Sequence, residues 1–121
     1  MTNFQATVTA KTGIQKLGNK VSNKLPQVKD PSINVRDRLN DGLQMAKYQL
    51  VGYQYGINEA IDPQLRQLLI KNRDRLQDVQ VKLFTELFDL GEYQANIAQQ
   101  PEVADAYDVF SGYTVQLPMQ Q

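Results

Sequence analysis

Apolar residues recur in alternating steps of four and three along two long stretches of the chain, and this spacing most constrains the fold. The first set is Leu39, Leu43, Ala46, Leu50, Tyr53, Ile57 and Ala60, and the second is Leu65, Leu69, Asn72, Leu76, Val79, Leu83, Glu86 and Leu90, with Asn72 and Glu86 as its polar members. Such spacing places each set on one side of an α-helix that packs lengthwise against other helices. The sequence therefore predicts an all-α fold with two long helices, over about residues 34–60 and 63–90.

Residues at the ends of the two stretches support these limits. Asn34 is a good N-cap, and Asp37 in the first turn suits the positive end of the helix dipole. Asp62 followed by Pro63 is a typical helix start, and Gly91 is a natural stop. Because the connection between the two helices is short, we expect them to form an antiparallel hairpin.

A shorter third helix is predicted over about residues 101–117, between Pro101 and Pro118. Its expected inward residues are Val103, Tyr107, Phe110, Thr114 and Leu117. One short helix covers only part of a long hairpin, so apolar surface would stay exposed. We therefore expect self-association, with a dimer favoured, to complete a four-helix bundle.

Residues 1–33 form a basic N-terminal arm outside the helical domain of residues 34–118, and two interpretations of it stay open. The arm is either mostly disordered or contains a short amphipathic helix at 14–25, whose apolar side would carry Ile14, Leu17, Val21 and Leu25. In the second case it would dock on a partner or a sister subunit. Glycine and asparagine in this stretch disfavour an isolated helix, so the helix would need a surface to form on.

Composition excludes several classes of function. The chain has no Cys and no His, which removes disulfides, thiolate ligands and the commonest general base. Its longest apolar run is three residues, Leu68–Ile70, and we expect neither a membrane span nor a signal peptide. The basic arm is too sparse and too poor in aromatics to predict nucleic-acid binding. Binding of a membrane surface through residues 14–25 is a weak alternative.

Charge is unevenly placed although the net charge is zero. Residues 1–29 hold five lysines and no acid, and residues 83–121 hold six acids and no Lys or Arg. This asymmetry permits attraction between the two ends, within one chain or between chains. The charge-rich stretch KNRDRLQDV at 71–79 is mostly a solvated helix side, with Asn72 on the apolar seam and Arg75 beside it.

Three segments of the chain resemble one known family. RDRLNDGLQMAKYQLVGYQYGINEAIDPQLRQLL at 36–69, QVKLFTELFDLGEY at 80–93 and VFSGYTVQLP at 109–118 are similar, in this order, to the spore coat F-like proteins of endospore-forming bacteria. The resemblance implies a ferritin-like helical bundle and a place in the protein layers around the spore.

Ferritin-like bundles often hold two metal ions between Glu and Glu-x-x-His ligands on the inner seam. The resemblance implies a Glu at the position of Ala46, and Glu-x-x-His at the positions of Asn72 and Arg75. This chain has none of these ligands, so we interpret the three positions as a degenerate metal site and expect no metal or other cofactor. Glu59 and Glu86 are carboxylates without imidazole partners.

The resemblance predicts a non-enzymatic structural protein of the spore coat, made in the cytoplasm of the mother cell. It would act by self-association and by docking to other spore coat proteins. The alternative is a metal-dependent ferritin-like oxidoreductase that uses Glu59 or Glu86. Cross-linking through Gln, Lys or tyrosines such as Tyr48, Tyr55 and Tyr113 also stays open.

Overall fold

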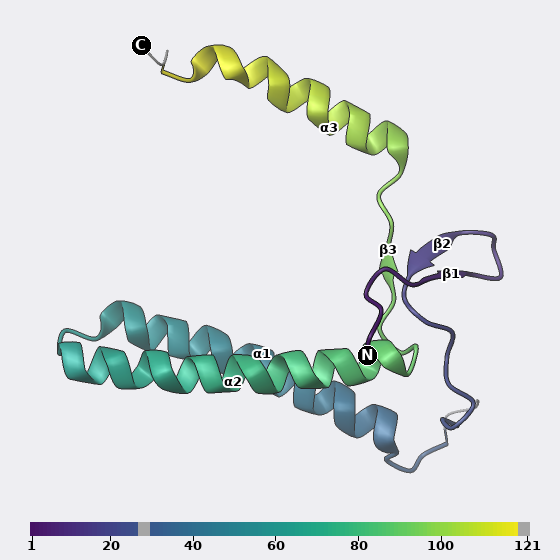
Figure 1. Ribbon diagram of the computed structural model, residues 1–121. Helices are drawn as coiled ribbons and strands as arrows, with labels where there is room; N and C mark the ends of the chain where they lie inside the picture. The colour runs from purple at the N-terminus through teal and green to yellow at the C-terminus, as the bar shows by residue number, and fades with distance from the viewer. Residues whose placement is uncertain (27–29, 119–121) are drawn as a thin grey trace.

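Two long antiparallel helices dominate the computed structural model, which describes residues 1–26 and 30–118 (Figure 1). Helix α1 spans Val35–Glu59 and α2 spans Pro63–Asp89. A third helix, α3, spans Gln100–Gly112 and continues into the 3₁₀-helix η1 at Tyr113–Gln116. The helical architecture and the limits expected from the sequence are confirmed.

The helix ends follow the capping chemistry of the sequence. The Asn34 side chain accepts a hydrogen bond from the Asp37 backbone N–H, and the Asp37 carboxylate accepts one from the Asn34 N–H, both at 3.1 Å. Asp62 accepts from the N–H of Gln64 at 2.9 Å, with Pro63 as the first helical residue. These bonds satisfy donors that a helix start would otherwise leave unpaired.

The N-terminal arm forms strands instead of the amphipathic helix considered for residues 14–25. Strands β1 (Thr7–Thr9), β2 (Gln15–Leu17) and β3 (Ala95–Asn96) make a small antiparallel sheet in the order β1-β2-β3. Lys16 pairs with Asn96, so the arm is joined to the chain that follows α2. Gly13, with φ +88°, forms the turn between β1 and β2, a backbone conformation that a helix does not allow.

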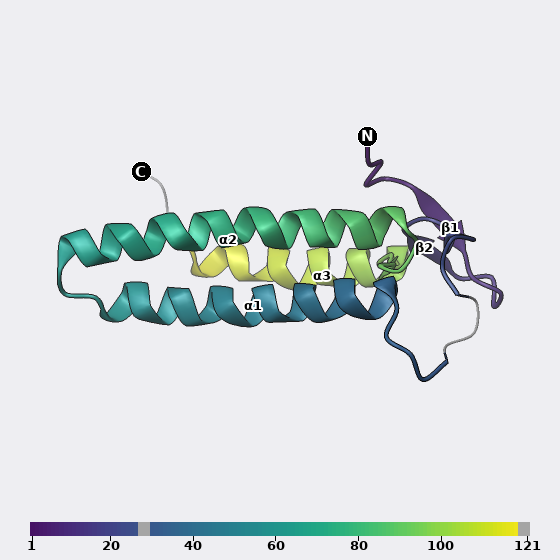
Figure 2. The ribbon, with the colours of Figure 1, turned by 90° about the horizontal axis from the view of Figure 1, so that it is seen from below.

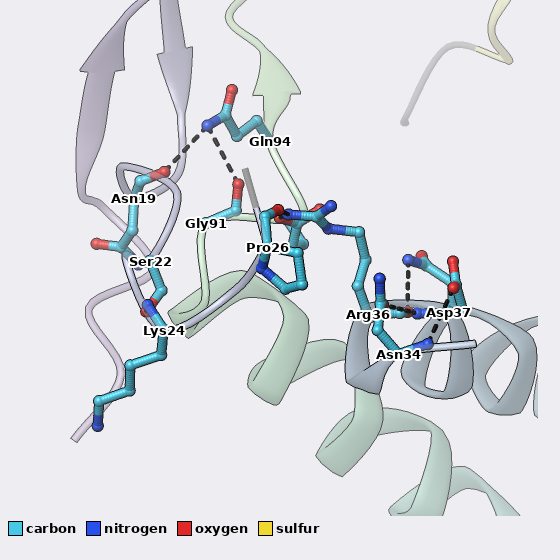
Figure 3. A network of polar contacts seen from close by, with 11 residues as sticks. Asn19, Ser22, Lys24, Pro26, Asn34, Arg36, Asp37, Gly91 and Gln94 are labelled. Carbon is cyan, nitrogen blue, oxygen red and sulfur yellow. Dashed lines mark hydrogen bonds and ion pairs between the residues drawn. The ribbon is translucent and has the colours of Figure 1, made fainter. Parts of the chain in front are cut away.

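The arm also closes one end of the hairpin, which we call the clamp end (Figure 3). The Asn19 side chain donates to the Phe88 carbonyl at 3.1 Å, and the Ser22 N–H donates to the Leu90 carbonyl at 2.9 Å. Gln94 donates to the Asn19 carbonyl at 3.0 Å. The arm thus supplies hydrogen-bond donors to the carbonyls at the end of α2, which a helix cannot satisfy by itself.

A partly buried ion pair holds the start of α1 in the same clamp. Arg36 Nη2 lies 2.8 Å from Glu92 Oε1, and the two side chains are 20% and 14% exposed. Although this distance is short, the contact lacks hydrogen-bond geometry, so we regard it as a charge interaction. Arg36 also donates to the Pro26 carbonyl at 3.2 Å. The arm, the start of α1 and the turn after α2 therefore share one network (Figure 3).

Most of the hydrophobic core lies near the clamp end. Leu43 and Ala46 of α1 are buried, as are Leu87 and Phe88 of α2. Phe4 of the arm lies against Phe84 and Phe88, with ring centroids 6.1 and 5.2 Å apart. The Tyr93 ring lies edge-on to the Phe84 ring, with the two ring centroids 4.6 Å apart.

The inner side of α2 differs from the predicted seam in one respect. Leu65, Val79 and Glu86 are exposed, whereas Leu87 and Phe88 are buried. A strict seven-residue spacing drifts by about 20° per heptad on a straight α-helix. Over the length of α2 this drift moves the contact line from the predicted residues to their neighbours.

The prediction that one side of α3 faces inward is wrong for this chain. Within the described residues α3 contacts no secondary-structure element except η1, and none of its residues is buried. Tyr107 is 77% and Phe110 69% exposed. Figure 1 shows α3 standing apart from the hairpin beyond β3, and Figure 2, seen from below, shows that its axis points in roughly the same direction as the hairpin.

Candidate interaction surface

An open groove lies between α1 and α2 in the half of the hairpin away from the clamp. It has a volume of about 560 Å³ and is lined by Gln49, Gly52, Tyr53, Gly56, Leu69 and Leu76. We call it the distal groove. None of its lining residues carries a formal charge, so it suits an apolar or weakly polar occupant.

Two glycines create the depth of the distal groove. A Cβ built on Gly52 would meet no atom within 4 Å, and one on Gly56 would meet only Leu69 Cδ1, at 3.5 Å. Glycine is unfavourable inside a helix by about 0.5–1 kcal/mol relative to alanine. The gap left by the missing side chain at Gly52 is filled by nothing within the described chain.

Exposed apolar residues extend the surface on both sides of the groove. On α1 the helical spacing places Met45, Tyr48 and Tyr55 beside Gly52, and all three are exposed. On α2 Leu65 and Leu68 are exposed near Leu69. Large contiguous apolar surfaces of this kind mark interaction sites in folded proteins.

The helix α2 carries positive charge beside the distal groove. Arg73 donates to Gln54 at 3.0 Å and pairs with Asp74 at 3.2 Å, both within the hairpin. Lys71 and Arg75 are exposed, and neither has an ion-pair or hydrogen-bond partner in the described part of the chain. Of these two cations, Arg75 lies at the edge of the groove side of α2, next to Leu76, and Lys71 lies on the opposite side of the helix from Leu69.

The structure does not bring the degenerate metal-site positions to one level. Gly42 faces Leu83 and Gly56 faces Leu69, which fixes the antiparallel register of the hairpin. In this register Asn72 is displaced from the level of Ala46 by about 10 Å along the axis, at 1.5 Å per residue. Ala46 is buried in the core, Asn72 is half-buried and Arg75 is exposed.

The two carboxylates considered as alternative ligands are also far apart. Glu59 ends α1 beside the connecting turn, and Glu86 lies near the end of α2 at the clamp. Their separation along the axis is about 30 Å at 1.5 Å per residue in the same register. Across residues 1–26 and 30–118, no group of three or more acidic side chains has a geometry that would hold a metal ion.

Comparison with known proteins identifies the hairpin. The model of the Coat F domain matches residues 34–96, just over half of the chain. The chain belongs to the Coat F domain family. The Coat F match begins at the N-cap of α1 and ends at the last residue of β3, so it includes the hairpin, Glu92 and the distal groove. No curated protein and no solved structure matches the chain.

The Coat F match points to a spore coat protein and leaves α3 outside the matched region. Among the described residues, no helix combines the length and the apolar character needed to cross a membrane. Sequence reasoning placed Tyr53 and Leu76 on the seam but did not identify the groove that they line. Gly52 and Gly56, four residues apart beside the seam, were the available signal.

Proposed function

We propose that this Coat F protein is a non-enzymatic structural component of the spore coat that acts by self-association and by docking to other coat proteins. The observation that carries the proposal is the uncovered apolar surface of the distal groove. A two-helix hairpin buries one side of each helix, and the remaining apolar area requires another protein surface.

The chemistry of the groove supports binding rather than catalysis. Its side chains are aliphatic, amide and phenolic, and Tyr53 is its one titratable member. Such a surface fits the apolar side of a helix, in the manner of helix-in-groove recognition. A ferritin-like four-helix bundle formed by two copies would satisfy both hairpins.

The proposal includes the place of synthesis. The protein is made in the mother-cell cytoplasm and joins the coat from there, with coat proteins as its partners. The Coat F match supports the spore coat as the destination.

Sedimentation equilibrium of the full chain tests self-association, and a fluorescently labelled copy in the sporulating host tests localisation. We expect a dimer at micromolar concentration and label on the spore surface. Leu69→Asp, which places a charge in the groove, is the test variant, and Gln44→Asp, on an exposed residue outside the groove lining, is its control. A strictly monomeric protein whose label stays away from spores would end the proposal.

A further inference from the structure

We propose that the distal groove of each copy is occupied by α3 of a second copy, so that two chains exchange their C-terminal helices. This inference rests on the proposed self-association and names the segment that makes the contact. Four properties of the chain support it: the exposure of α3, its charge, its length and its point of attachment.

The first property is that α3 has no surface of its own to pack on. Val103, Tyr107 and Phe110 fall on one side of α3 and are all exposed. An isolated helix shorter than about 12–15 residues is marginal in water, and α3 spans Gln100–Gly112. A helix of this length with an apolar side is therefore stabilised by docking on another surface.

Charge is complementary between α3 and the distal half of the hairpin. The segment 100–118 carries Glu102, Asp105 and Asp108 and no basic residue. On α2 the exposed Arg75 precedes Leu76 of the groove lining, whereas the exposed Lys71 lies on the opposite side of the helix from Leu69. Complementary charge steers two surfaces together and favours one docking orientation. An acidic amphipathic helix is the occupant that this groove fits in both apolarity and charge.

The length of α3 matches the uncovered part of the hairpin. At 1.5 Å per residue α3 is about 20 Å long, and α1 from Met45 to Glu59 extends about 21 Å. The other half of the hairpin is already covered on one side by Phe4 and the clamp. One α3 thus fits the distal half and leaves the clamp in place.

The attachment of α3 favours a second copy over its own hairpin. Residues 97–99 join α3 to β3, and β3 is held by β2 through the pairs Lys16–Asn96 and Leu17–Ala95. Held there, α3 contacts no element of its own hairpin within the described residues, and Figure 1 shows it standing apart from α1 and α2. In Figure 2 α3 begins at the clamp end and ends short of the connecting turn. In an antiparallel dimer the clamp end of one copy lies beside the distal groove of the other, and two-fold symmetry makes both contacts.

Two complementary variants of the full chain test the exchange. Phe110→Asp disables α3 and keeps the groove, and Gly52→Leu fills the groove and keeps α3. Phe110 is exposed and Gly52 has open space, so both variants keep the fold of the single chain, which circular dichroism verifies. Each variant alone loses both contacts, and we expect its dimer Kd to rise by at least about a hundredfold.

When the two variants are mixed, the intact α3 of the Gly52→Leu chain can dock in the intact groove of the Phe110→Asp chain. One of the two contacts is thereby restored. An affinity-tagged copy of one variant should then retain the other, while neither retains itself. Two matched controls should dimerise like the unmodified chain. They are Val115→Asp, at an exposed apolar residue outside the α3 stripe, and Gln44→Leu, outside the groove lining.

Each other result overturns the exchange in a different way. If Phe110→Asp remains dimeric, the two hairpins pair directly, and self-association survives without the exchange. If both variants are monomeric and their mixture is too, α3 docks in its own chain or elsewhere. If the unmodified chain is monomeric, the proposed self-association fails along with the inference.

Discussion

Substitution of Gly91 by alanine should destabilise the fold more than any other single added methyl group at a glycine of the clamp. Gly91 has φ +77°, and a Cβ there would lie 2.4 Å from the Lys20 carbonyl oxygen and 2.6 Å from the Val21 nitrogen. Both neighbours are backbone atoms, so no side-chain rotation relieves the contact. The arm must move away from the end of α2.

The magnitude follows from two contributions. A left-handed backbone conformation costs a residue with a Cβ about 1–2 kcal/mol. Movement of the arm breaks the bonds from Ser22 N–H to Leu90 and from the Asn19 side chain to Phe88, each contributing about 1 kcal/mol net. We expect a loss of about 3–4 kcal/mol, a large part of the 5–15 kcal/mol that typically stabilises a domain.

Urea denaturation followed by far-ultraviolet circular dichroism, at one fixed protein concentration, measures this loss. Gly42→Ala is the matched control, because its Cβ would make an ordinary contact with Leu83 at 3.5 Å inside a helix, and it should be neutral or slightly stabilising. Gly91→Asn separates the two contributions, since asparagine tolerates the left-handed conformation but retains the Cβ. A Gly91→Ala midpoint equal to that of Gly42→Ala would refute the close approach of the arm.

Three further outcomes are expected from the clamp, the core and the composition. Arg36→Met should lower the free energy of unfolding by about 1–3 kcal/mol in the same urea assay, because it leaves the partly buried Glu92 carboxylate unpaired. Adding Glu92→Gln should recover part of that loss. Additive losses from the two substitutions would contradict the ion pair. Leu87→Ala should cost about 2–5 kcal/mol because this side chain is 0% exposed, and a smaller loss would show that the core collapses around the cavity. Protein purified without chelator should contain no stoichiometric iron or manganese by mass spectrometry, and a bound metal would revive the oxidoreductase alternative.

Local signals predicted the helices, and long-range contacts explain what the sequence did not reveal. Asn34, Asp62 and Gly91 act within a few residues of themselves, so the limits of α1 and α2 follow from capping chemistry alone. The pairing of Lys16 with Asn96 joins residues 80 positions apart and leaves no alternating pattern in such short strands. Periodicity also identified the apolar side of α3, because periodicity depends on the helix itself. It carries no information on what covers that side, and α3 is therefore exposed where inward residues were expected.

The same contacts argue against the docking role considered for the N-terminal arm and leave α3 as the candidate in our proposal. One of the two interpretations of the arm made it a docking segment, but Asn19, Ser22 and Phe4 contact the end of α2 within the chain. An arm used as an internal clamp cannot leave to bind a partner without exposing Phe88 and the unpaired carbonyls of α2. The acidic α3 packs against no helix or strand of the described chain except η1, so its release would expose no core residue. In the proposed exchange the acidic α3 would meet α2 of the second copy rather than the basic arm, and α3 lies outside the residues of the Coat F match.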